Sequence, residues 1–167
     1  MPWKMRLGMR SNTVCLDTSY LVGLFDKADR WHTRAREIDS LLLHYQVGVS
    51  FLDCVLNELF TVLARRCRER GSPEAFLSLL DQVAQAAQET PITWLYPHVP
   101  RWYSRCLGIM RGSQGQLNFH DALIVVAMQE LGFSVLLSFD AGFDEVVSIN
   151  RLGSTNEVAL WLKERHP

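Results

Sequence analysis

The sequence predicts an α/β domain of three layers, in which helices cover both faces of a central parallel sheet. Short segments with apolar residues at consecutive positions, such as VCL at 14–16 and VLL at 135–137, are typical of strands buried on both faces. Longer segments of helical periodicity alternate with them, and strands that alternate with helices form parallel sheets. We therefore expect a three-layer α/β/α sandwich.

The expected elements follow one another with few long connections. Strands are expected at residues 13–16, 46–50, 91–95, 134–139 and 146–149. Helices are expected at residues 19–25, 31–45, 52–70, 73–88, 99–110, 118–131 and 156–164. The helix at 52–70 has an apolar face that includes Leu56, Leu59 and Leu63, and it ends at Gly71.

Length and composition indicate one globular domain. The chain has 167 residues, 48% of them hydrophobic and 21% charged, so it can bury a core and is not wholly disordered. We interpret residues 1–12 as an N-terminal extension, of a kind that is often poorly ordered, and residues 13–167 as a single domain. Met1, Met5 and Met9 leave the true start of the protein open.

Charge, cysteine spacing and hydropathy limit the partners and the cellular compartment that the sequence suggests. With 17 basic and 18 acidic residues the net charge is −1, so a nucleic-acid partner would need a local basic patch. The four cysteines show no CxxC spacing, which favours a reduced, cytoplasmic protein over a zinc or disulfide protein. The sequence contains no apolar segment with the length of a membrane span or the pattern of a signal peptide.

Four acidic residues are expected to meet at one edge of the sheet. Asp17 and Asp140 directly follow predicted strands, whose carboxyl ends border the ligand crevice of such a sheet. Asp121 lies in the first turn of its helix, at the same edge. Glu58 lies further into its helix, but its long side chain tilts toward the helix amino end. The four carboxylates should therefore converge.

This convergence predicts a divalent metal ion. Carboxylates repel one another, and a group of them without a cation would have raised pKa values. No Lys or Arg is next to any of the four acids in the sequence. Mg²⁺ and Mn²⁺ are hard cations that prefer oxygen ligands. Acidic sites of this kind suit phosphodiester hydrolysis, in which the metal activates water and offsets the developing negative charge.

Each acid also has an ordinary structural interpretation. Asp17 could cap the helix that follows it, and Asn118 with Asp121 resembles a capping pair. Asp140 could be a turn residue. Glu58 is harder to explain in this way, because it interrupts an apolar helix face where a carboxylate without a partner is costly. These structural roles stay open for each acid taken singly. One shared metal site explains why all four acids are expected at one edge of the sheet, whereas four unrelated structural roles would not.

Four segments stand out by their order and spacing, although each is a weak motif alone. They are LDTSYLVGLF (16–25), LNELFTVLARR (56–66), NFHDALIVVAMQELG (118–132) and VLLSFDAGFDEV (135–146). Together they resemble PIN domains, and within that family the VapC-type toxins of bacterial toxin–antitoxin pairs. The resemblance covers about residues 13–150, and the extension at 1–12 and the loop at 111–116 depart from it.

The resemblance implies a PIN-like fold and a Mg²⁺- or Mn²⁺-dependent endoribonuclease that acts as a toxin. It also implies RNA as the substrate, a small antitoxin that occupies the site, and a homodimer. Ser19 matches the hydroxyl residue that supports the first aspartate in the family, Ser138 stands at the place of a later Ser or Thr, and Asp144 is a candidate outer acid. The family's metal-binding and catalytic quartet maps onto Asp17, Glu58, Asp121 and Asp140.

Arginines are the candidates for RNA contact. Arg101, Arg105 and Arg111 recur along one predicted helix and its end, and we expect them to bind phosphates. The arginines within 65–70 suit the dipole at the end of their helix, and we expect them to lie away from the metal edge. The tryptophans, Trp31 among them, are interpreted as core or interface residues rather than platforms for stacked bases.

Two other functions are alternatives. A PIN domain without catalysis could bind RNA or act as a scaffold, but it would have no reason to keep four mutually repelling acids. An aspartyl-phosphate protein also places Asp after its first strand. It would need a second acid where Ser19 stands, or a Lys within 135–140, and this chain has neither. The sequence thus predicts a metal-dependent endoribonuclease, the toxin of a toxin–antitoxin pair.

Overall fold

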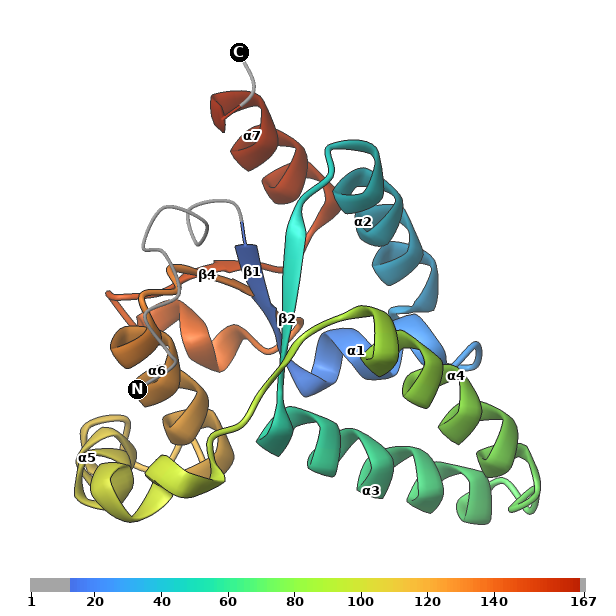
Figure 1. Ribbon diagram of the computed structural model, residues 1–167, viewed down its shortest axis with the longest axis horizontal. Helices are drawn as coiled ribbons and strands as arrows, with labels where there is room; N and C mark the ends of the chain where they lie inside the picture. The colour runs from blue at the N-terminus through green and yellow to red at the C-terminus, as the bar shows by residue number, and fades with distance from the viewer. Residues whose placement is uncertain (1–12, 166–167) are drawn as a thin grey trace.

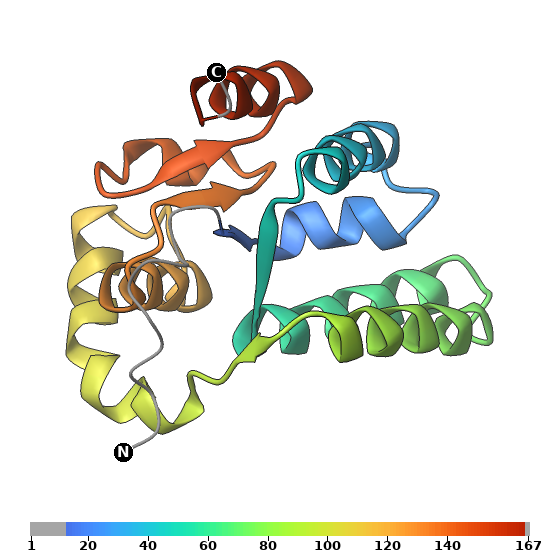
Figure 2. The same ribbon diagram turned by 45° about the horizontal axis from the view of Figure 1, so that its top comes forward.

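Five short parallel strands form the central sheet of the computed structural model, which describes residues 13–165 (Figures 1 and 2). The strands are β1 (Thr13–Leu16), β2 (Gly48–Leu52), β3 (Ile92–Thr93), β4 (Val135–Leu137) and β5 (Asn150–Leu152). Their order is β3-β2-β1-β4-β5, so the winding direction reverses between β1 and β4. A reversal of this kind opens a crevice at the carboxyl ends of the two strands. The predicted extension at 1–12 lies outside the described residues.

Helices cover both faces of the sheet, which confirms the predicted three-layer α/β/α architecture. Figures 1 and 2 show α5 and α6 on one side and α1, α2 and α7 on the other, while α3 and α4 lie side by side next to α1. Within residues 13–165, no helix has the length and apolar character needed to cross a membrane. The helices are α1 (Thr18–Phe25), α2 (His32–His44), α3 (Asp53–Glu69), α4 (Ala75–Glu89), α5 (Val99–Gly112), α6 (Phe119–Leu131) and α7 (Thr155–Arg165).

The last strand does not lie where the sequence predicted it. Residues 146–149 form a turn, in which the Val146 N–H donates to the Phe143 carbonyl and the Ile149 N–H donates to the Val146 carbonyl. Strand β5 begins only at Asn150, where it pairs with β4. The prediction of a strand at 146–149 was wrong because apolar residues in a turn mimic the pattern of a short strand. The second strand is also displaced, to Gly48–Leu52.

Helix α6 is buried on nearly every side, and Asp121 in its first turn is buried with it. All residues from 121 to 128 are buried, because α6 packs between the sheet and α5. A helix that is apolar all round is expected in such a position. Asp121 is therefore buried with its first turn at the carboxyl edge of the sheet.

The buried carboxylate of Asp53 fixes the start of α3. Its Oδ2 atom accepts hydrogen bonds from the backbone N–H groups of Leu95 (2.8 Å) and Tyr96 (3.1 Å), and its Oδ1 atom accepts one from Cys54 (2.8 Å). The side chain of Asp53 is only 5% exposed. These bonds tie the first residue of α3 to the segment that leaves β3, and so fix the position of Glu58 further along the helix.

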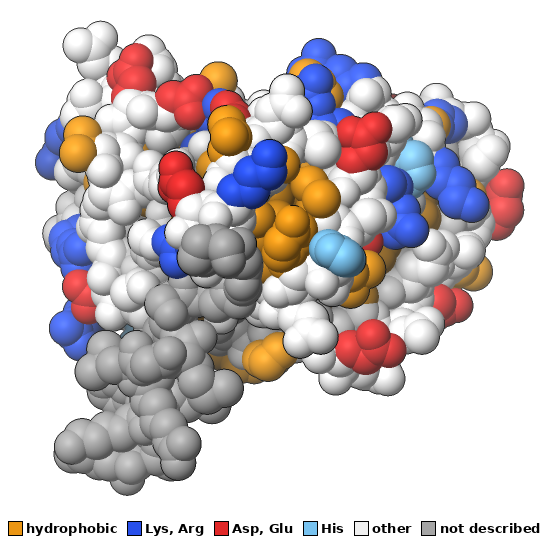
Figure 3. Space-filling view, turned by 90° about the horizontal axis from the view of Figure 1, so that it is seen from above, with side chains coloured by type: hydrophobic (Ala, Val, Ile, Leu, Met, Phe, Trp, Pro, Cys, Tyr) orange, Lys and Arg blue, Asp and Glu red, His pale blue; other side chains and the backbone are white. Residues whose placement is uncertain are grey.

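Charges of both signs are interspersed over the surface seen in Figure 3. This distribution agrees with the net charge of −1. A polyanion would therefore have to bind to a local arrangement of cations rather than to the general field of the protein.

Replacing Asp53 by Asn should destabilise the protein by about 1–3 kcal/mol, because one amide nitrogen would face backbone N–H donors and leave them unsatisfied. Urea denaturation of the variant and of Asp81→Asn, an exposed change on α4, measures this difference. Equal unfolding free energies for the two variants would contradict the structural role given to Asp53.

Candidate active site

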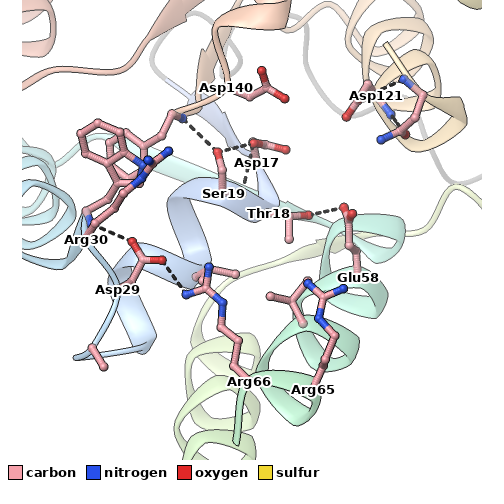
Figure 4. Close-up of a pocket in the computed structure, with 16 residues that line it drawn as sticks. Asp17, Thr18, Ser19, Asp29, Arg30, Glu58, Arg65, Arg66, Asp121 and Asp140 are labelled. Carbon is pink, nitrogen blue, oxygen red and sulfur yellow. Dashed lines mark hydrogen bonds and ion pairs between the residues drawn. The ribbon is translucent and has the colours of Figure 1, made fainter. Parts of the chain in front are cut away.

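A cavity of about 680 Å³ opens at the carboxyl edge of the sheet, and all four predicted acids line it (Figure 4). Asp17 follows β1 and Asp140 lies just beyond β4, while Glu58 comes from α3 and Asp121 from the start of α6. Figure 4 shows the four carboxylates around one open space. Residues that are far apart in the sequence are thus brought together, as the strand and helix positions predicted.

Asp17 is the most buried of the four acids, with 4% of its surface exposed. Its Oδ2 atom accepts hydrogen bonds from the Ser19 hydroxyl (2.6 Å), the Ser19 N–H (3.2 Å) and the Ser138 hydroxyl (2.7 Å). The Oδ1 atom accepts none of these three bonds. Burial raises the pKa of Asp17, although the hydrogen bonds from Ser19 and Ser138 oppose that rise.

The same two serines connect Asp17 to the end of β4. The Ser138 hydroxyl accepts a hydrogen bond from the Asp140 N–H (3.0 Å), and the Ser19 hydroxyl accepts one from the Phe139 N–H (2.9 Å). Both hydroxyl hydrogens are therefore directed at the Asp17 carboxylate, while both oxygens hold the backbone that leads to Asp140. The resemblance implied supporting roles for Ser19 and Ser138; both hydroxyls donate to Asp17, and their role in catalysis stays a prediction.

Glu58 has a partner that the sequence did not reveal. The Thr18 hydroxyl donates to its Oε2 atom at 2.7 Å, and the His120 Nδ1 atom lies 4.0 Å from the same oxygen. The carboxylate is one-third exposed toward the cavity. The side chain at first appeared to lack a partner on an apolar face, but it is held at the cavity by the first residue of α1.

Asp121 is a helix cap and a cavity residue at once. The Asn118 N–H donates to its Oδ2 atom (2.8 Å), and its own N–H donates to Asn118 Oδ1 (3.1 Å), which completes a capping box. Burial raises the pKa of Asp121 to about 6, against the Asn118 bond, and the negative charges of the other three acids add to the rise. The pKa of this carboxyl group therefore depends in part on the charges of the other three acids.

Asp140 is exposed, and its Oδ1 atom accepts a hydrogen bond from the Gly142 N–H (2.8 Å) at the start of the 3₁₀-helix η2 (Ala141–Glu145). Asp144, the candidate outer acid, does not line the cavity. It is paired with Arg151, whose Nη2 atom donates to Asp144 Oδ2 (2.9 Å) and whose Nη1 atom donates to the Ser138 carbonyl (3.0 Å). Any influence of Asp144 on the site would pass through Arg151 and the backbone.

The donor set fits a hard divalent cation. Four carboxylates face one cavity, and burial, with a smaller contribution from the other three negative charges, raises the pKa of Asp121. In the part of the chain that the structure describes, no three His, Cys, Asp or Glu side chains are already grouped as a metal-binding set. Glu58, Asp121 and Asp140 each accept a hydrogen bond from a local donor, so metal binding would require their side chains to rotate.

Arginines also line this cavity. Those within 65–70 were expected to lie away from the metal edge, and this expectation was wrong for Arg65 and Arg66, while Arg68 and Arg70 do not line the cavity. Arg65 and Arg66 line it because α3 runs alongside α1 (Figure 4). Arg66 is engaged by two acids, Asp26 (3.1 Å) and Asp29 (2.5 Å). Arg30, in the loop between α1 and α2, lines the cavity as well, and no periodic pattern marked it.

The arginines that the sequence favoured lie elsewhere. Arg101 and Arg105 are ion-paired with Glu130 of α6, and Arg105 also donates to Gln129 (2.9 Å). Arg111 is exposed near the end of α5. None of the three lines the cavity, and their contact with RNA stays a prediction.

Both the sequence and the fold are similar to those of known proteins. Residues 14–148 match the model of the PIN domain family. VapC20 of Mycobacterium tuberculosis, a toxin that cleaves the sarcin–ricin loop, is 20% identical with a TM-score of 0.62, covering 80% of this chain and 95% of that one. VapBC2 of Rickettsia felis, bound to promoter DNA, is 15% identical with a TM-score of 0.62, covering 84% and 97%.

A third solved structure, PAE2754 of Pyrobaculum aerophilum, is 16% identical with a TM-score of 0.56, covering 94% of this chain and 99% of that one. No curated protein matches the sequence. At these identities, the three structures show a shared fold.

The raised pKa of Asp121 predicts how the stability of the metal-free protein depends on pH. Between pH 4 and 6 the folded state holds a proton that the unfolded chain releases, so stability falls as pH rises through this window. Relative to Asp121→Asn, the wild type should lose about 1–2 kcal/mol of unfolding free energy between pH 4 and 7. Denaturation series in EDTA measure this, with Glu89→Gln as a control outside the cavity. A wild type that gains stability against Asp121→Asn over this range would contradict it.

Proposed function

Since the chain belongs to the PIN-domain family, we propose that it is a divalent-metal-dependent endoribonuclease with Asp17, Glu58, Asp121 and Asp140 as its metal ligands. One observation carries the proposal: the carboxylates of all four acids line one cavity at the carboxyl edge of the sheet. Four carboxylates gathered from four elements are costly for folding unless they bind a cation. An aspartyl-phosphate protein would not need this quartet.

Mg²⁺ or Mn²⁺, when bound, would make a water molecule more acidic and offset the negative charge that develops on the phosphate. The chain's own residues orient the ligands. Ser19 and Ser138 both donate to Oδ2 of Asp17, and these two bonds orient its carboxylate. The link from Ser138 to the Asp140 N–H sets the backbone of the second aspartate relative to the first.

Cations that line the same cavity would bind the RNA backbone. Arg65, on the same helix as Glu58, has a side chain that is 59% exposed, and its ion pair among the described residues is a long one with Glu69, at 3.8 Å, so its guanidinium is available to a phosphate. The protein has no net positive charge, and RNA affinity must come from such local contacts.

We further propose that the nuclease is the toxin of a toxin–antitoxin pair in the cytoplasm, with RNA as substrate, a small cognate antitoxin as partner and a homodimer as its assembly. The fold shared with VapC20 and VapBC2 supports the toxin proposal. A PIN domain that binds RNA without cleaving it is the alternative, and the complete quartet disfavours it.

Asp17→Asn or Asp140→Asn should lower cleavage of labelled RNA in Mn²⁺ by about 100-fold or more, because the metal loses an anionic ligand. RNA binding should be retained, since cations make the phosphate contacts. The wild type should lose cleavage in EDTA. Glu145→Gln, an exposed change near Asp140 in the sequence, serves as the matched control. Full cleavage by either aspartate variant would remove that residue from the ligand set.

A growth assay tests the toxin proposal separately from the chemistry. Expression of the wild-type chain in a bacterial host should arrest growth, and Glu58→Gln should relieve the arrest at equal protein levels. The reason is that Gln keeps an oxygen for the Thr18 hydroxyl but loses the negative charge. Growth that is indifferent to the wild-type protein would favour a housekeeping nuclease or a binding module.

A further inference from the structure

Two arginines share one tryptophan ring at the edge of the cavity. The guanidinium carbon of Arg30 lies 4.8 Å from the centroid of the Trp31 ring, and that of Arg34 lies 4.6 Å from it. Trp31 is itself stacked on Phe139, with ring centroids 5.2 Å apart and an interplanar angle of 26°. Phe139 directly precedes Asp140. The stack therefore holds two cations beside the end of β4, close to an acid of the quartet.

Neither guanidinium has an acidic partner among residues 13–165. The acid nearest to Arg30 in the sequence, Asp29, is already bound by Arg66 and by the Trp31 N–H (2.7 Å). The acid nearest to Arg34, Glu37, accepts a hydrogen bond from the Thr155 hydroxyl (2.9 Å). Two like charges held on one ring repel each other, and no carboxylate among the described residues forms an ion pair with either of them, although acids line both hollows. Binding of an anion from outside the protein would reduce the repulsion between the two guanidinium groups, as a cation would reduce the repulsion among the four carboxylates.

An ion-pair cluster holds the loop that carries this stack. Arg66 bonds both Asp26 and Asp29, and Arg70 donates to both oxygens of Asp26 at 2.7 and 2.8 Å. Asp26 also accepts a bond from the Ala28 N–H (3.1 Å). Residues 26–31 are thus fixed to the last turns of α3, so Arg30 and Trp31 are displayed from an ordered loop.

The stack lies between two hollows. Trp31 and Phe139 line both the cavity of the four acids, which Arg30 also lines, and a second hollow of about 210 Å³, which Arg34 lines. Glu157 also borders the second hollow, but its carboxylate accepts bonds from the Gly153 and Ser154 N–H groups (2.8 and 2.9 Å). Figure 4 shows Arg30 across the cavity from Glu58. A strand that enters the acid cavity could therefore leave over Trp31 into the second hollow.

We propose that Arg30 and Arg34, held by Trp31, bind phosphates of the RNA strand next to the phosphodiester that is cleaved, and that Trp31 is a positioning residue for both. The inference rests on the proposed ribonuclease function and names the path of its substrate. A polynucleotide fits because it offers several phosphates in sequence along one line, whereas the two arginines face different hollows. This path runs away from Arg101 and Arg105, whose charges Glu130 engages.

The test compares two double variants that remove the same charge. Arg30→Gln/Arg34→Gln removes the pair, and Arg36→Gln/Arg68→Gln removes two exposed arginines outside both hollows. Binding of a fluorescent single-stranded oligoribonucleotide is measured in EDTA across a salt series. For the Arg30/Arg34 variant we expect roughly tenfold weaker binding near physiological salt, and a salt slope smaller by about 0.7 per lost phosphate contact. The control should keep the wild-type slope.

Trp31 is tested with two single variants. Trp31→Leu should weaken binding and reduce the salt slope, and Trp31→Phe should restore most of both, because Phe keeps an aromatic face for the guanidinium groups. Thermal melts verify that the variants are folded. If Trp31→Leu does not fold, Trp31→Phe and the arginine double variant still decide the outcome.

Wild-type affinity and slope in Arg30→Gln/Arg34→Gln would overturn the inference, as would an equal loss in the control. Binding of a fluorescent acidic peptide is measured in the same way. If Arg30→Gln/Arg34→Gln loses binding to this peptide but keeps binding to RNA, the inference is overturned in favour of a protein partner. Absence of Mn²⁺-dependent cleavage by the wild type, with arginine-dependent RNA binding intact, would instead refute the proposed ribonuclease and leave the RNA path standing.

Discussion

Repulsion among four carboxylates is the constraint on which the rest of this structure depends. Asp17, Glu58, Asp121 and Asp140 come from four elements and face one cavity, and the three other charges add to the rise that burial causes in the pKa of Asp121. Folding brings these charges together although each would be better solvated apart. The fold tolerates this arrangement by giving each carboxylate its own donor, and a divalent cation would remove the remaining cost.

The donors that make this possible are the ordinary devices of helix and turn capping. Asp17 accepts bonds from the first turn of α1, Asp121 belongs to the capping box of α6, and Asp140 caps the 3₁₀-turn that follows it. Capping and metal binding are therefore not alternatives at these positions. A carboxylate that caps a helix at the carboxyl edge of a parallel sheet is already aimed at the crevice, and one capping oxygen leaves the other for a ligand.

Positive charge is arranged around the same cavity by a different principle. Arg66 and Arg70 form ion pairs with Asp26 and Asp29. Burial alone would raise the pKa of Asp26, but the hydrogen bonds from these arginines hold this pKa below its ordinary value. That cluster fixes the loop between α1 and α2, and the fixed loop presents Arg30 without an acidic partner. Arg66, which is ion-paired, and Arg30, which has no ion pair among the described residues, thus line the same cavity of a protein with a net charge of −1.

The sequence by itself determined the parallel α/β architecture and the gathering of the four acids. Both depend on local facts: apolar runs identify buried strands, and a residue directly after a strand or in the first turn of a helix must lie at the carboxyl edge. Other features depend on how distant segments pack. Only the tertiary structure decided four of them: the position of β5, the Thr18 partner of Glu58, the backbone bonds of Asp53, and the placement of Arg65 and Arg30 at the cavity. The physical reason is that each requires α1, α3 and the sheet edge to meet at particular angles, and hydrophobic periodicity sets which face of a helix is buried but not which distant neighbour that face meets.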